Sequence, residues 1–180
     1  MDHGVLFSEV DVFLDWLRSG SSEYLATISG DGEYRLAEVL AYINLLEESS
    51  FGVVFGSRSQ SRHQFFESLQ AAYGESPLHY YVSWMGALCL SAAFSARYRV
   101  IFSDPLTGFR IYRRSAIPSG VRDRLLQGPR PRGTVEIARL LVQGHVEIAE
   151  VPVTYRTFRG YTDMSWRFRR GLRNAWSALG

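Results

Sequence analysis

Short apolar runs alternate with helical apolar patterns in the first third of the chain, and this alternation limits the possible folds more than any other feature. Residues 24–28 and 51–55 are apolar runs that end in glycine- and serine-containing turns, as buried strands do. Residues 5–18 and 36–46 repeat apolar side chains at helical spacing. The alternation predicts an α/β fold, with a parallel sheet between two layers of helices.

The middle and the end of the chain predict further strands and a loop. Residues 99–102 and 145–155 have strand character, and Pro152 places the second strand at a sheet edge because proline lacks the N–H that a ladder needs. Residues 120–133 hold two prolines and four arginines, and we expect them to form a surface loop.

Residues 78–96 contain no Asp, Glu or Arg, and their number reaches the lower limit for crossing a bilayer. Serines, tyrosines and a histidine dilute the hydrophobicity of this stretch. A buried or interfacial helix is therefore favoured over a membrane span.

Length and composition indicate one folded domain, since the chain has 180 residues, of which 46% are hydrophobic and 21% are charged. Cys89 is the single cysteine, which excludes an internal disulfide. The first four residues lack the basic segment that precedes the apolar run of a signal peptide, so no signal peptide is expected. The expected location is cytoplasmic, peripheral at the membrane.

Charge is divided unevenly along the chain. Residues 1–96 hold four arginines and twelve acidic residues, whereas residues 97–180 hold sixteen arginines and six acidic residues. Every one of the 20 basic residues is arginine, whose planar guanidinium suits bidentate binding of phosphate. A GC-rich coding sequence is an alternative explanation for the missing lysines, but it does not explain the division. The basic half therefore predicts an anionic partner.

Residues 165–180 have the pattern of a basic amphipathic helix. Phe168, Leu172, Ala175 and Leu179 lie on one stripe, and arginines lie outside it. Such a helix can lie in an anionic lipid interface. The alternative is a surface helix that packs on its own domain.

Six short segments, in order along the chain, resemble the motifs of family 2 glycosyltransferases of the polyprenyl-phosphate (dolichyl-phosphate mannosyltransferase-like) type. Their counterparts are the Asp-x-Asp turn, the "VIGSR" strand end, the "D-x-x-[ST]-G-F-R-x-[FY]-R" segment, an "E-I" helix start, "EVPV-x-Y" and "G-x-S-K-[ML]". In this chain they are residues 29–34, 53–58, 104–113, 136–137, 150–155 and 160–164.

The resemblance implies a Rossmann-like nucleotide-diphospho-sugar transferase fold and transfer of a sugar, with inversion, from a nucleotide-sugar donor to a polyprenyl phosphate at the membrane surface. It implies that Asp31 and Glu33 bind the donor and hold Mg²⁺ or Mn²⁺, whose charge neutralises the diphosphate leaving group.

The acceptor side follows from the same resemblance. Asp104 matches the carboxylate that acts as base or organises the acceptor site, and Arg58, Arg110 and Arg113 match positions that contact the acceptor phosphate. Because a lipid phosphate is already an anionic nucleophile, it needs positioning more than it needs a strong base. Simple turn chemistry at the two aspartates and ordinary surface pairs at the arginines are the alternatives.

The chain departs from the family pattern in three ways. The family's N-terminal half has no counterpart, so residues 1–164 correspond to a partial domain, incomplete at the N-terminus, and a partner chain that supplies the nucleotide-binding half is one expectation. Ser29 replaces the first aspartate of Asp-x-Asp, and Asp163 replaces a lysine. A non-catalytic module that binds lipid phosphate is therefore the alternative function. No nucleic-acid partner is expected, because no helix-turn-helix or RNA-binding signature accompanies the arginines.

Overall fold

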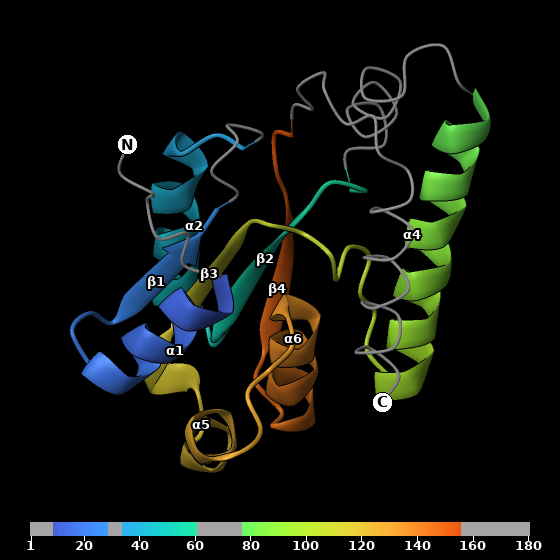
Figure 1. Ribbon diagram of the computed structural model, residues 1–180. Coiled ribbons are helices and arrows are strands. Elements are labelled where there is room, and N and C mark those ends of the chain that lie inside the picture. The colour runs from blue at the N-terminus through green and yellow to red at the C-terminus, as the bar shows by residue number, and fades with distance from the viewer. Residues whose placement is uncertain (1–8, 29–33, 61–76, 156–180) are drawn as a thin grey trace, which may run out of the picture.

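The computed structural model describes residues 9–28, 34–60 and 77–155 (Figure 1). A four-stranded sheet in the order β1-β3-β2-β4 forms its centre. The strands are β1 (Tyr24–Thr27), β2 (Val53–Ser57), β3 (Arg110–Arg113) and β4 (Ile148–Pro152). The described helices are α1 (Glu9–Ser19), α2 (Ala37–Glu48), α4 (Pro77–Tyr98), α5 (Ser119–Gln127) and α6 (Thr134–Gln143), with a 3₁₀ turn η1 (Arg114–Ala116) after β3.

The α/β class is confirmed, but the expectation of a parallel sheet is wrong. β2 and β4 are parallel, with Phe55 opposite Glu150, whereas β3 runs antiparallel to both β1 and β2. A strand inserted between two others can run either way, and the apolar pattern of a strand is the same in both directions. β4 lies at the edge of the described sheet, as Pro152 predicted.

Side chains alternate across the sheet and create two separate cores. Val53, Phe55 and Tyr112 face a core that they share with α1, α4, α5 and α6. Val54 and Ile111 face a second core that includes residues of α2. Because successive side chains of a strand point to opposite faces, these strands are apolar throughout, and helices cover both faces.

Two expected elements differ in the structure. Residues 99–102 form a turn and a loop, in which Arg99 has a φ of 55° and the backbone of Phe102 bonds with the Ser95 side chain. Part of the expected surface loop at 120–133 is helical, because Val121 and Leu125 of α5 fill the core beside α1 and α6. The helical spacing of these apolar residues determined the local structure more than the prolines that follow them did.

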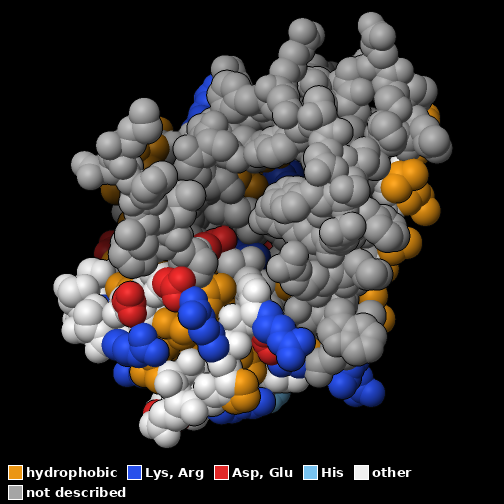
Figure 2. All heavy atoms as spheres, in the orientation of Figure 1, with side chains coloured by type: hydrophobic (Ala, Val, Ile, Leu, Met, Phe, Trp, Pro, Cys, Tyr) orange, Lys and Arg blue, Asp and Glu red, His pale blue; other side chains and the backbone are white. Residues whose placement is uncertain are grey.

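α4 is buried along one side and exposed along the other. Leu90 and Phe94 contact the first core, while Val82, Met85 and Leu88 are between 45% and 49% exposed. Figure 2 shows hydrophobic side chains along the outer side of α4. Among the described helices, none has both the length and the apolar character needed to cross a bilayer.

Candidate functional site

The candidate site lies where the parallel strands β2 and β4 end and where β3 begins. Arg58 follows the last residue of β2, and Asp104 lies in the loop before β3. Because β3 is antiparallel to β2, its first residue, Arg110, pairs with Phe55 near the end of β2. The carboxyl ends of parallel strands are the usual position of ligand sites in open α/β sheets.

Arg58 and Asp104 form a bidentate ion pair. The Arg58 Nε donates to Asp104 Oδ2 at 2.6 Å, and Nη2 donates to Oδ1 at 2.8 Å. The Arg58 backbone N–H also donates to Oδ2, at 3.2 Å. The side chains are 20% and 8% exposed, so water screens the pair only weakly.

The pair favours the charged form of the arginine. Burial by itself lowers the pKa of Arg58, but the charge and the hydrogen bonds of Asp104 outweigh it, and the net pKa lies well above its usual range. Arg58 is thus a permanent cation at the end of β2. Its guanidinium also lies over the Tyr155 ring, 5.3 Å from the centroid, a favourable cation–π position.

Tyr34 closes the other side of the site. Its hydroxyl accepts the Gly108 N–H at 3.2 Å, and its backbone pairs with Tyr155 in an isolated antiparallel bridge. Burial raises the pKa of Tyr34, and the charge of Arg58 opposes this rise. The phenol is therefore a neutral hydrogen-bonding group at ordinary pH.

Arg110 lies under the site, in the interior. It is completely buried; its Nη2 donates to the Pro105 carbonyl at 3.0 Å, and its guanidinium lies 4.7 Å from the Phe55 ring centroid. Its Nε and Nη1 have no hydrogen-bond partner among the described residues. Arg110 thus adds positive charge beneath the loop that carries Asp104, but it does not reach the surface.

Arg113 does not join this cluster, in contrast to what the resemblance implied. It lies at the opposite end of β3, where its backbone N–H donates to Gly52 at 2.9 Å. Its guanidinium donates to the carbonyls of Leu46 and Phe51, the latter at 2.8 Å. These bonds tie the end of α2 to the start of β2, so Arg113 has a structural role in this fold.

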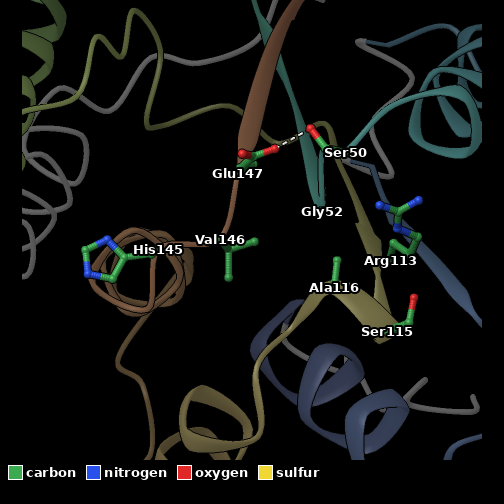
Figure 3. Close-up of a pocket in the computed structure, with 8 residues that line it drawn as sticks. All are labelled: Ser50, Gly52, Arg113, Ser115, Ala116, His145, Val146 and Glu147. Atoms are coloured by element: carbon green, nitrogen blue, oxygen red, sulfur yellow. Dashed lines mark hydrogen bonds between the residues drawn. The ribbon is translucent and has the colours of Figure 1, made fainter.

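A shallow depression of about 450 Å³ lies near Arg113, away from the Arg58–Asp104 pair (Figure 3). It is lined by Ser50, Gly52, Arg113, Ser115, Ala116, His145, Val146 and Glu147. Figure 3 shows that the Glu147 carboxylate accepts from the Ser50 hydroxyl and that the His145 ring points away from the other residues. The Ser115 hydroxyl binds the Glu23 carboxylate, and the Arg113 guanidinium binds backbone carbonyls. The depression lies at the end of the sheet away from Arg58 and Asp104, so it contributes nothing to the candidate site.

The expected donor and metal residues, Asp31 and Glu33, lie outside the described residues, as does the segment 165–180. Thr27, the last residue of β1, pairs with Arg110, and the Tyr34 hydroxyl accepts the Gly108 N–H, so these two residues lie beside the site. Within the described part of the chain, no three His, Cys, Asp or Glu side chains are grouped as metal ligands.

Sequence analysis did not identify Tyr34, Tyr155 and Glu150 as site residues. All three fall inside the segments that carry the family resemblance, and this was the available signal. Their roles depend on contacts with residues 46 or more positions away, such as the bond from the Asp104 N–H to Glu150, which no local pattern contains.

No family model matches the chain, and neither a curated protein nor a solved structure matches it.

Proposed function

We propose that the chain is a family 2 glycosyltransferase that moves a sugar from a nucleotide-sugar donor to a polyprenyl phosphate at a membrane surface. The observation that carries the proposal is the Arg58–Asp104 pair: two residues chosen for the acceptor site, 46 positions apart, meet at the end of a strand with hydrogen bonds of 2.6 and 2.8 Å. The Rossmann-like nucleotide-diphospho-sugar transferase fold is part of the proposal.

In this proposal Arg58 binds the acceptor phosphate, which carries the nucleophilic oxygen. The oxygen attacks the anomeric carbon of the sugar, the bond from that carbon to the diphosphate breaks, and the diphosphate leaves with its electron pair. Because both Asp104 oxygens already bind Arg58, Asp104 acts as the organiser of the arginine rather than as a strong base. A fixed guanidinium stabilises anionic groups without reorganisation during the reaction.

The donor side of the proposal rests on the sequence. Asp31 and Glu33 would hold Mg²⁺ or Mn²⁺, and a bound divalent cation would neutralise the charge of the leaving diphosphate. The described residues supply no group of three or more such ligands.

α4 is the element that would contact the membrane surface. Its outer side presents Val82, Met85 and Leu88, and the exposed Arg97 and Arg99 follow at its carboxyl end. Ile101 beyond them is 98% exposed. Apolar side chains beside arginines fit a lipid surface with anionic headgroups, where a lipid phosphate acceptor would be available.

The test is transfer of labelled sugar from a panel of nucleotide sugars to polyprenyl phosphate, with the full chain and with Arg58→Lys. Lysine keeps the charge but loses the planar fork, so the transfer rate should fall about tenfold or more. Arg18→Lys is the matched control, because Arg18 forms an exposed pair with Asp15 far from the site; its rate should equal that of the wild type.

The metal is tested in the same assay. Chelation of divalent cations and Asp31→Ala should each abolish transfer, and added Mg²⁺ or Mn²⁺ should restore it only in the chain that retains Asp31. Transfer that survives both changes would contradict the assigned donor site.

A second candidate is a non-catalytic module that binds lipid phosphate at the membrane. This candidate is favoured because Arg58 and Asp104 already bind each other. Their buried charges are therefore compensated without a substrate. This module would bind vesicles that contain polyprenyl phosphate, would release no nucleotide diphosphate, and would not bind a nucleotide sugar in a calorimetric titration.

A further inference from the structure

The loop that carries Asp104 is neither helix nor strand, yet side chains from two other elements bind its backbone. Buried backbone groups outside secondary structure need such partners, because an unpaired N–H or C=O is costly. The partners come from β4 and from the inner side of α4. The position of Asp104 is thus determined by side chains of β4 and α4.

Glu150 of β4 supplies the main contact. Its Oε2 accepts the Ser103 N–H at 2.8 Å, and its Oε1 accepts the Asp104 N–H at 2.9 Å. One carboxylate thus holds two successive peptide groups, an arrangement that fixes the direction of the Asp104 side chain. Charge-assisted hydrogen bonds of this kind are about twice as strong as neutral ones.

Two serines of α4 hold the same loop from the other side. The Ser91 hydroxyl donates to the Ser103 carbonyl at 2.6 Å. The Ser95 hydroxyl accepts the Phe102 N–H at 3.0 Å and lies 3.2 Å from the Phe102 carbonyl. These bonds leave the loop little freedom to move relative to β4 and α4.

We propose that Glu150 is the positioning residue that holds the Asp104 carboxylate against Arg58 and thereby presents the Arg58 guanidinium to the acceptor. The expected effect of Glu150 on the rate of transfer rests on the proposed function. Its expected effect on the Asp104 loop rests on the geometry alone. The Glu150 carboxylate binds the backbone N–H groups of Ser103 and Asp104, so it acts on Arg58 through that backbone.

The test compares Glu150→Gln with Glu147→Gln in the full chain. A glutamine at 150 offers one acceptor and one NH₂ group, so one of the two backbone N–H groups faces another donor. Glu147 precedes the same strand, and its carboxylate binds Ser50 at the far end of the sheet, which makes it the matched control.

Two quantities are measured. Amide hydrogen exchange at Ser103 and Asp104 should accelerate tenfold or more in Glu150→Gln and should not change in Glu147→Gln. The kcat of transfer should fall tenfold or more while KM for the nucleotide sugar stays within twofold, because the donor is bound elsewhere. A merely structural role would lower the melting temperature and leave kcat of the folded fraction unchanged.

Each other outcome has a defined meaning. Wild-type exchange at both amides in Glu150→Gln would overturn the proposal, and so would an equal fall of kcat in both variants. If Glu150→Gln does not fold, Glu150→Asp retains both acceptor oxygens one methylene further away, and the same two measurements apply to it. A wild-type chain that transfers no sugar refutes the proposed function, and the exchange rates alone then decide the role of Glu150.

Discussion

Arg58, Arg110 and Arg113 lie in different surroundings, which the sequence alone does not distinguish. Arg58 has a bidentate carboxylate partner, Arg113 binds backbone carbonyls, and Arg110 is completely buried with one hydrogen bond to Pro105 and two nitrogens unpartnered among the described residues. A buried cation is tolerated where acceptors or an aromatic face compensate for lost water. Arg58 and Arg113 are both partly exposed, but Arg113 is held by backbone carbonyls at the far end of β3. Arg58, fixed by a carboxylate at the candidate site, is the one suited to bind an external anion.

The Arg58–Asp104 pair should be essential for stability as well as for the site. Asp104→Ala leaves the Arg58 charge with little water and no carboxylate, and we expect the free energy of unfolding to fall by about 3 kcal/mol. Urea denaturation measures this change.

Asp15→Ala is the control for this prediction. It removes an exposed pair with Arg18, whose side chain is 56% exposed, and it should cost about 0.5 kcal/mol or less. Equal losses in the two variants would mean that the buried pair contributes no more than a surface pair.

At the scale of single elements, α4 joins two surfaces with different chemistry. Its inner serines bind the Asp104 loop, and its outer apolar side chains face away from the core. A helix of this kind can connect a surface that binds lipid with a loop that carries a site residue. The sequence alone indicated the absence of charge in 78–96 but not which side chains would be exposed.

Binding of the full chain to vesicles tests the outer side of α4. Met85→Glu/Leu88→Glu places two charges on that side and should weaken binding to vesicles of mixed neutral and anionic lipid about tenfold or more. Sedimentation of vesicles measures the bound fraction, and raised salt should weaken binding further, because Arg97 and Arg99 contribute through charge.

Leu40→Glu is the matched control for vesicle binding. Leu40 lies on α2, on the other side of the sheet, and is 71% exposed. If Leu40→Glu weakens binding as much as the α4 variant does, the effect reflects overall charge and the docking surface is not α4.

At the scale of the whole molecule, both faces of the sheet are covered and the cores contain buried tyrosines. Burial raises the pKa of Tyr112 to about 12, with the charge of Arg110 opposing the rise. Tyr112 packs against Phe13 of α1 at 4.7 Å between ring centroids, so its ionisation would place a charge between α1 and the sheet. The fold therefore depends on this phenol being neutral.

The stability of the protein should consequently fall in alkali. An ordinary tyrosine in the unfolded chain loses its proton near pH 10, whereas Tyr112 keeps its proton up to about pH 12 in the folded chain. The folded state thus binds more protons between these values, and the free energy of unfolding decreases as pH rises through this range, by roughly 3 kcal/mol for this group.

Urea unfolding from pH 9 to 12 measures the decrease. Tyr112→Phe should flatten the pH dependence, whereas Tyr81→Phe, at a tyrosine that is 58% exposed, should leave it as in the wild type. An unchanged slope in Tyr112→Phe would show that other groups cause the alkaline loss.

The sequence by itself determined the local elements of this protein. Apolar spacing, which acts over a few residues, predicted strands at 24–28 and 51–55, and the structure has them at Tyr24–Thr27 and Val53–Ser57. It also predicted α1, α2 and the helical character of 78–96. The motif order also identified Arg58 and Asp104, which the structure brings together. Glycosyl transfer stays a prediction, as do the metal and the roles of Asp31 and Glu33.

Only the tertiary structure decided how these elements meet. Three features depend on contacts between residues 46 or more positions apart: the antiparallel direction of β3, the place of Arg113 at the far end of that strand, and the hydrogen bonds from Glu150 to the Asp104 loop. Apolar spacing contains no information on strand direction, and a carboxylate finds its partners only after the chain has packed. For that reason the sequence yielded the candidate residues, whereas their geometry required the fold.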